Sequence, residues 1–554
     1  MPELNTPEDA MPLLAYKIAP RQFDLSYRFS NISLRDQIVR AQMLVRTLVE
    51  TKLVEAETPD ADTETRSCKF QLLICGAGAA GLAAAKEADA HNISFVLVEK
   101  GRSVPGGVLR SKAMRYVSTS MYEWPHPNHR EHDYPLSKPA LLGDDVPPRP
   151  TLFLKFDAPV LIQKFGAELR NQLKLDIRHW RRNFAKYRST GFPTKRSLLA
   201  TTAEIAEKSK IALKALLNGS ESVHGVVLSG SELPDIEIHA HPDRTILDTY
   251  QFEYVIYAVG FSKESKTYDG KKYPYRGFKH TPFWKPDDIF DDKINFDSPP
   301  RVGILGSGDG ALQDALRCLI KKEYQNPLDS WNGLMQYKQV DNVPLGDSVH
   351  VRDALAEVAA ADGYTTGGAI WHHESNLFQS LDSEFEKIVN ALIVNEGTKI
   401  WHALGSMVRT DVKSVTIVRL HGHFSKAYAL NRFFVILLRR LLSVSTVKDV
   451  PTLEFIDGTV TKFGRFGPNL RGGQLAIESA AVGTTLRDFD LVLIRGGLDR
   501  TDPPLQVVGL SDKDTGRVGL GRIPPPIRPI ALAPNSTTSS EGVASDGRTV
   551  GASS

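Results

Sequence analysis

One stretch, residues 70–107, constrains the fold of this chain more than any other. It combines an apolar run at Gln71–Cys75, glycines spaced as G-x-G-x-x-G, an alanine-rich segment at Ala83–Ala90, a second apolar run at Phe95–Val98 and the acid Glu99. Apolar runs of this length indicate buried parallel strands, and the segment between them is typical of a helix. The order of these parts predicts a βαβ unit with a nucleotide-binding turn.

The three glycines of this turn have different tasks. Gly76 permits a tight turn, Gly78 lets the backbone approach a pyrophosphate, and Gly81 allows the helix and strand to pack closely. The helix that follows offers free N–H groups to the phosphates. Glu99 is placed to accept hydrogen bonds from a ribose diol. A plain glycine-rich loop is the alternative, but the flanking strands and the acid favour a dinucleotide site.

The length, charge and cysteines of the chain restrict its class. A chain of 554 residues can bury two or three domain cores, and a formal net charge of +3 favours no nucleic-acid partner. The three cysteines, Cys68, Cys75 and Cys318, form no C-x-x-C pair, so a redox dithiol is not expected. Acids near the N-terminus and short apolar runs predict a cytoplasmic protein without a secretory signal or membrane span.

A second turn of the same kind follows the apolar run Val302–Leu305. Gly306, Gly308 and Ala311 are spaced as G-x-G-x-x-A and open a segment with helical character. This pattern predicts a second nucleotide site. Asp309 conflicts with that interpretation, because a carboxylate in a phosphate loop repels a pyrophosphate unless it points away.

The strand that should follow the second turn is displaced along the chain. The strand pattern resumes only at Val415–Val418 and ends at Arg419. The intervening residues 323–412 are expected to form a helical insertion. Because ligands of open α/β sheets bind at the carboxyl ends of strands, this insertion is a candidate for the substrate pocket.

With a further Gly-Gly at Gly106–Gly107, the chain resembles the flavoproteins that carry two dinucleotide-binding domains. It is most similar to the NAD(P)H-dependent flavin monooxygenases, which include amine N-hydroxylases. The resemblance implies an α/β fold with two Rossmann-like domains, one for FAD and one for NAD(P)H. Strands that end in Ala-x-Gly or Gly-Gly return to the cofactor in this family. The candidate cofactor-binding residues are Gly76, Gly78, Ala79, Ala80, Gly81, Glu99, Lys100, Gly106, Gly107, Ala258, Gly260, Gly306, Gly308, Ala311, Arg419, Gly496 and Gly497.

The resemblance and the composition together predict how the chain is divided. The predicted parts are an N-terminal helical extension (1–65), an FAD-binding domain (66–300 and 480–522), an NAD(P)H-binding domain (301–322 and 413–479), a helical insertion (323–412) and a disordered tail (523–554). The tail is predicted from its proline-rich and then Ser/Thr/Gly-rich composition.

The activity implied by the resemblance is oxygenation of a small organic molecule with NAD(P)H and molecular oxygen as co-substrates. Arg419 is a candidate contact for the 2′-phosphate of NADP, and a structural arginine at a strand end is the alternative. No catalytic residue and no metal site can be named. The rival functions are a flavin reductase, oxidase or dehydrogenase without oxygen transfer, and a non-catalytic flavin- or NAD-sensing protein. The substrate and the oligomeric state stay open.

Overall fold

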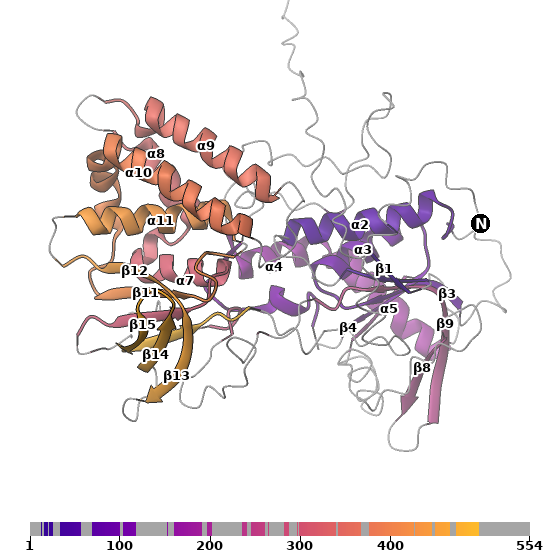
Figure 1. The fold of residues 1–554 in the computed structure, drawn as a ribbon. Coiled ribbons are helices and arrows are strands. Elements are labelled where there is room, and N and C mark those ends of the chain that lie inside the picture. Colours follow the sequence, from indigo (N-terminus) through magenta and orange to yellow (C-terminus); the bar gives the residue numbers. More distant parts are fainter. Residues whose placement is uncertain are drawn as a thin grey trace, which may run out of the picture.

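The computed structural model describes most of the chain outside its termini and longer loops. The described residues are 13, 16–19, 21–25, 34–56, 69–99, 103–117, 152, 160–190, 197–201, 235–240, 245–260, 264, 282–286, 296, 298–338, 342–366, 376–425, 427–445, 449–465 and 472–497. They form two α/β bodies that lie side by side (Figure 1). Lys100 and the tail 523–554 lie outside the described residues.

The first body is built on a seven-stranded sheet. Its strands are β1 (Lys17–Ala19), β2 (Gln22–Asp24), β3 (Lys69–Cys75), β4 (Phe95–Glu99), β7 (Ser197–Thr201), β8 (Asp235–Ala240) and β9 (Thr245–Tyr257). The order is β1-β2-β9-β3-β4-β7, with β8 antiparallel beside β9. Strand β3 is parallel to both of its neighbours, β9 and β4. The predicted βαβ unit therefore occupies the centre of this sheet.

Helices cover the first sheet, and the N-terminal segment supplies one of them. The helices are α2 (Leu34–Glu50), α3 (Ala79–Ala90), α4 (Ile162–Gln172) and α5 (Lys174–Thr190); two short strands, β5 (Tyr116–Val117) and β6 (Val160–Leu161), pair before α4. Helix α2 packs on α3, where Arg46 Nη2 lies 2.8 Å from Glu87 Oε1. Strand β2 joins the sheet beside β9, with Phe23 opposite Ile256. The described residues of the predicted extension 1–65 are thus integrated into the first body.

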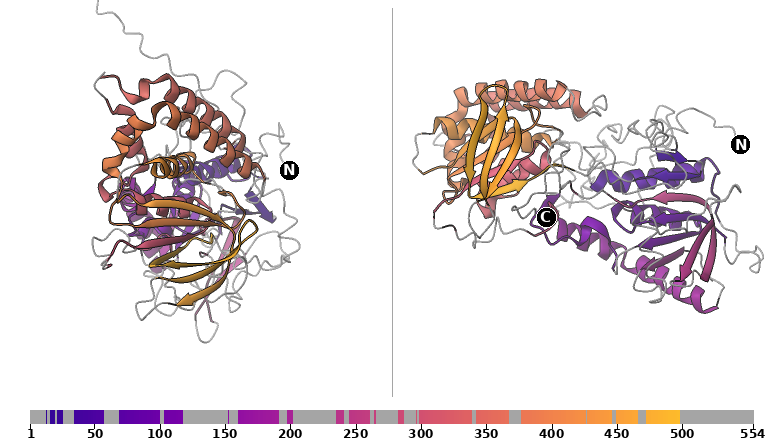
Figure 2. Two further views of the ribbon diagram at one scale, coloured as in Figure 1. Left: turned by 60° about the vertical axis from the view of Figure 1, so that its left-hand side comes forward. Right: turned by 60° about the horizontal axis from the view of Figure 1, so that its bottom comes forward.

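The second body has a four-stranded parallel sheet with a different layer on each face. The strands are β10 (Arg301–Leu305), β11 (Ser414–Arg419), β12 (Thr452–Asp457) and β16 (Leu491–Ile494), in the order β12-β11-β10-β16. Helices α7 (Asp309–Leu319) and α11 (Ala429–Val444) cover one face, and an antiparallel sheet of β13 (Thr459–Arg465), β14 (Gly473–Ser479) and β15 (Gly483–Phe489) covers the other (Figure 2). Alternate residues of β10 serve the two layers: Ile304 packs with the helices, and Leu305 packs with the antiparallel sheet.

The insertion is helical, as predicted. It contains α8 (Pro327–Gln336), α9 (Val349–Thr366) and α10 (Asn376–Leu404). Helix α10 packs on α11, where the rings of Phe385 and Phe433 lie 6.3 Å apart, and Trp331 of α8 lies edge-on to Phe433 at 5.5 Å. The insertion therefore shares the hydrophobic core of the second body.

One predicted boundary is wrong. Residues 480–522 were expected in the FAD-binding domain, but β15 and β16 within this range belong to the second body, where Ile494 lies opposite Leu305 in a parallel ladder. Residues 498–522 lie outside the described residues. The error has a physical reason. Both bodies end a strand in small residues beside a glycine turn, so the pattern alone does not say which sheet the strand joins.

Candidate dinucleotide-binding sites

The first glycine turn has the geometry that its sequence predicts. Gly76 has φ of +99°, and a Cβ at this position would lie 2.5 Å from the carbonyl oxygen of Ala258. A Cβ at Gly81 would collide with the carbonyl of Gly76. The fold itself therefore requires glycine at both positions. A Cβ at Gly78 would meet no atom within 4 Å, so the space in front of this residue is open to a ligand.

The helix after the first turn begins without a side-chain cap. Gly78 is its N-cap, and no side chain accepts a hydrogen bond from the first turn at this cap. Ala79 and Ala80 form the first turn of α3, so small side chains flank its N–H groups. Backbone donors at the positive end of a helix suit a pyrophosphate. The first turn thus fits a dinucleotide.

The acid and the Gly-Gly pair lie at the same turn. Glu99 is buried, and its Oε2 accepts a hydrogen bond of 2.8 Å from the backbone N–H of Ala77. Gly106 donates its N–H to the carbonyl of Ala77 at 2.7 Å, and a Cβ on Gly106 would collide with the Glu99 carboxylate. Gly107 follows in the left-handed region with φ of +61°. These contacts bring the predicted ribose acceptor to the edge of the glycine turn.

The second glycine turn repeats these contacts. Gly306 has φ of +141°, and a Cβ there would collide with the carbonyl of Arg495, just as Gly76 faces Ala258. Gly306 donates its N–H to Val418 O at 3.1 Å; in the first body Gly76 donates to Val98 O at 2.7 Å. Gly308 is the N-cap of α7 without a side-chain cap, and the buried Ala311 lies in the first turn of the helix. The two turns are therefore geometrically equivalent.

The strands that flank the two turns end alike. Ala258 follows β9 and donates its N–H to Cys75 O at 2.8 Å, and Gly260 has φ of +79°. In the second body Gly497 also has φ of +79°. Gly496 and Gly497 were predicted to approach the flavin on a strand of the first domain. The strand is placed differently: they follow β16 of the second body, beside the second glycine turn, and their approach to the flavin stays a prediction.

The conflict at Asp309 is resolved by its contacts. Its Oδ1 accepts hydrogen bonds from the Tyr428 backbone N–H at 3.1 Å and from Asn431 Nδ2 at 2.8 Å, and its Oδ2 accepts one from Gln313 at 2.7 Å. The carboxylate lies at the N-terminus of α11, whose dipole favours a negative charge. Burial raises the pKa of Asp309, and these hydrogen bonds oppose the rise. The carboxylate is thus engaged with α11.

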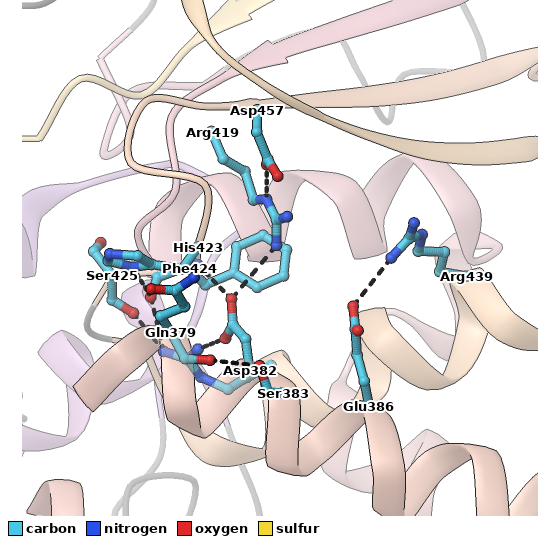
Figure 3. Close-up of polar contacts among 11 residues, drawn as sticks. Gln379, Asp382, Ser383, Glu386, Arg419, His423, Phe424, Ser425, Arg439 and Asp457 are labelled. Carbon is cyan, nitrogen blue, oxygen red and sulfur yellow. Dashed lines mark hydrogen bonds and ion pairs between the residues drawn. The ribbon is translucent and has the colours of Figure 1, made fainter. Parts of the chain in front are cut away.

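Arg419, at the end of β11, contacts two carboxylates (Figure 3) and two aromatic rings. Its Nε lies 2.7 Å from Asp457 Oδ1, and its Nη1 lies 3.4 Å from Asp382 Oδ2. Its Cζ is 5.0 Å from the ring centroids of both Phe424 and Phe455. These contacts favour the structural alternative for Arg419, and contact with a 2′-phosphate stays a prediction.

A buried charge cluster that the sequence did not predict joins the two bodies. Asp314 of α7 is fully buried and accepts hydrogen bonds from Arg317 at 2.7 Å, from Arg495 at 2.6 Å and from Arg115 of the first body. Although burial alone would raise it, the three guanidinium groups hold the pKa of Asp314 well below its ordinary value. An acid on the apolar face of α7 was the one local signal of this cluster.

Comparisons with known proteins agree with the first unit. Residues 74–138 match the family model of the NAD(P)-binding Rossmann-like domain. No curated protein matches the chain.

Among the residues that the structure describes, no helix is long and apolar enough to cross a membrane, and no group of three His, Cys, Asp or Glu residues is placed to hold a metal ion.

By their names, solved structures with similarity to the chain include disulfide and thioredoxin reductases and a steroid monooxygenase. The bacillithiol disulfide reductase of Staphylococcus aureus is 13% identical, with 81% of this chain and 80% of that chain covered and a TM-score of 0.33. The thioredoxin reductase of T. acidophilum is 15% identical (80% and 83% covered, TM-score 0.33). A steroid monooxygenase bound to NADP is 11% identical (78% and 72% covered, TM-score 0.33). Scores this low assign no chemistry to the chain.

Proposed function

We propose that this protein is an FAD-dependent oxidoreductase that takes electrons from NAD(P)H. The observation that carries the proposal is the repeated turn: Gly76 and Gly306 make the same backbone contacts in two separate sheets. Two equivalent turns in one chain suit two dinucleotides, one in each body. The match of residues 74–138 to an NAD(P)-binding Rossmann-like model supports the first of them.

FAD is proposed for the first turn. There Glu99 lies at the end of β4, against the turn, and Gly106–Gly107 follows it as in the flavoproteins that the sequence resembles. The second turn has Arg419 in place of an acid, so it is proposed for NAD(P)H. FAD would supply two-electron chemistry as the hydride acceptor. The residues of this chain bind and orient: Gly78 leaves room for the pyrophosphate, and the first turn of α3 donates N–H groups to it.

Oxygenation of a small molecule is the finer proposal, with molecular oxygen as the second substrate. It rests on the sequence resemblance to flavin monooxygenases. Dithiol chemistry is disfavoured, because the chain has no C-x-x-C pair. Burial raises the pKa of the Cys75 thiol to about 12, so Cys75 is not a reactive thiolate at neutral pH, and Cys318 is buried away from solvent. A reductase, an oxidase or a flavin-sensing protein remains the alternative that experiment must exclude.

The proposal is tested by Gly78→Val and Gly308→Val. A side chain on Gly78 would enter open space, so the first variant should fold and lose bound FAD with its yellow colour. A side chain on Gly308 would meet Ser425 Oγ at 3.3 Å, so the second variant should keep FAD and lose flavin reduction by NADPH. Absorbance spectra and anaerobic stopped-flow reduction measure both effects. A fully yellow, folded Gly78→Val protein would contradict the assignment of FAD.

Oxygen transfer needs its own measurement. The wild-type protein with NADPH and oxygen should consume both, and without a substrate the oxygen should appear as hydrogen peroxide. A panel of small primary amines and ketones is then added, and an oxygenating enzyme releases less peroxide per NADPH with the correct substrate. Flavin reduction without oxygen consumption would instead favour a reductase or dehydrogenase.

A further inference from the structure

Asp382 lies outside both βαβ units and yet contacts the second one. It belongs to α10 of the insertion and is buried, with 6% of its surface exposed. Its Oδ2 accepts a hydrogen bond of 2.6 Å from the backbone N–H of Phe424 (Figure 3). Its Oδ1 accepts one from Arg432 Nη1. Phe424 is part of the loop 420–425, the first part of the connection between β11 and α11. One carboxylate of the insertion therefore holds a backbone group and a cation of the nucleotide unit.

These contacts continue to the second glycine turn. Arg432 Nη2 donates to Ser425 O at 2.5 Å, and the Ser425 N–H donates to Ser307 O at 2.8 Å. Ser307 lies between the first two glycines of the turn. In the first body the hydrogen bond from Gly106 to Ala77 occupies the equivalent position. The loop 420–425 is thus the counterpart of the segment that, in the first unit, runs from the ribose acid to the Gly-Gly pair.

The cations around this loop need the Asp382 carboxylate as their counter-charge. Arg432 is 1% exposed, and burial lowers its pKa to about 10, while Asp362 and Asp309 oppose that change. Asp382 gives Arg432 and Arg419 a shared anion, and all three residues are buried. Removing one partner of a buried pair leaves an uncompensated charge, so the loop would lose its anchor.

A second contact from the same helix supports the loop. Phe378 of α10 is buried, and its ring lies 6.4 Å from that of His423. The His423 ring in turn lies 6.0 Å from that of His421, and its Nδ1 is 3.2 Å from Phe424 O. Helix α10 therefore contacts the loop through an apolar ring as well as through a carboxylate.

We propose that Asp382 is a positioning residue for the second dinucleotide, and that the insertion holds the loop 420–425 in the shape that binds the adenosine end of NAD(P)H. The inference rests on the proposed function of the second turn. It follows from position: the loop begins at the carboxyl end of β11, where the ribose of a dinucleotide lies in this type of fold. Asp382 itself acts through Phe424 and Arg432 rather than on the ligand.

The test compares Asp382→Asn with Glu386→Gln in the FAD-loaded full-length protein. Glu386 lies one turn further along α10 and pairs at 3.1 Å with Arg439, where both side chains are partly exposed. Binding of NADPH and of ADP-ribose is measured by calorimetry, and the rate of flavin reduction is measured at saturating NADPH. For Asp382→Asn the dissociation constants of both probes should rise by about tenfold or more. The saturated reduction rate should stay within about twofold, because only binding changes.

The control and the remaining outcomes separate the inference from the proposed function. Glu386→Gln should bind both probes like the wild type. If Asp382→Asn does not fold, Asp382→Asn with Arg432→Met removes both charges together and should fold with the same loss of affinity. Equal affinity in the wild type and the Asp382 variants would overturn this inference alone. A wild-type protein that binds neither probe would overturn the proposed function together with it.

Discussion

Gly260 in the first body and Gly497 in the second adopt the same backbone conformation, with φ of +79° at each. Strand β9 ends at Tyr257 and β16 ends at Ile494, so each glycine follows its strand at the same interval. Each strand adjoins the strand that leads into a glycine turn. The two bodies are therefore repeats of one nucleotide-binding design, although their other elements differ.

This equivalence predicts the effect of replacing either glycine. A Cβ at Gly260 or Gly497 would meet no atom within 4 Å, so Gly→Ala should cost only the strain of the left-handed backbone, roughly 1–2 kcal/mol of unfolding free energy. Gly78→Ala is the control, because Gly78 has φ of −78° and equally open space. Denaturant unfolding of the FAD-free proteins measures the difference. A loss in Gly78→Ala as large as in the other two would show that strain is not the cause.

The Asp314 cluster predicts a large effect on stability. Asp314→Asn leaves three guanidinium groups around a neutral amide, so the unfolding free energy should fall by roughly 3–5 kcal/mol. Asp490→Asn is the control. The side chains of Arg301 and Asp490 are 41% and 35% exposed, so their ion pair is expected to contribute less than about 1 kcal/mol. Equal losses in the two variants would contradict a special role for the buried cluster.

The lowered pKa of Asp314 also predicts how the stabilities of the wild type and of Asp314→Asn depend on pH. A carboxyl whose folded pKa lies below its unfolded pKa stabilises the protein fully above the unfolded value, and this contribution is lost as the pH falls through the folded value. The unfolded pKa is about 3.9. The difference in stability between wild type and Asp314→Asn should thus be constant near pH 7 and should decrease only below about pH 4. A difference that changes between pH 6 and pH 8 would point to another group.

Arg419→Ala tests which of its two interpretations holds. Its pairing with Asp382 and Asp457 predicts that NADPH and NADH lose affinity by similar factors, because the variant disturbs the support of the loop and not one phosphate contact. A contact with the 2′-phosphate would instead weaken NADPH alone, by about tenfold to a hundredfold. Arg439→Ala is the control, since Arg439 pairs with Glu386 on the same face of the second body. Dissociation constants for both cofactors decide between the two results.

The parts of the fold that could be predicted are those that depend on short, continuous stretches of sequence. Both glycine turns and the helical insertion were predicted correctly, because strand, turn and helix follow one another along the chain. The sheet to which β16 belongs was not, because strand pairing joins residues far apart and both sheets accept a strand that ends in glycine. Contacts such as Asp382 with Phe424, or Asp314 with Arg115, depend on packing between elements that have no common local pattern.

The insertion contributes side chains to the core of the second body. Phe385 of α10 is fully buried against Phe433 of α11, so Phe385→Ala should cost roughly 3–5 kcal/mol. Val394 lies on the same helix with 81% of its surface exposed, and Val394→Ala should change stability by less than about 0.5 kcal/mol.

The first βαβ unit lies in the other body, so Phe385→Ala should keep FAD while the second body unfolds at lower denaturant. Flavin absorbance and far-ultraviolet circular dichroism, followed in one titration, separate the two events.

The same packing predicts that replacing residues 323–412 by a short linker exposes the α11 face and destabilises the second body, instead of removing a substrate pocket alone. A shortened protein whose second body unfolds like that of the wild type would show that the insertion is an independent unit.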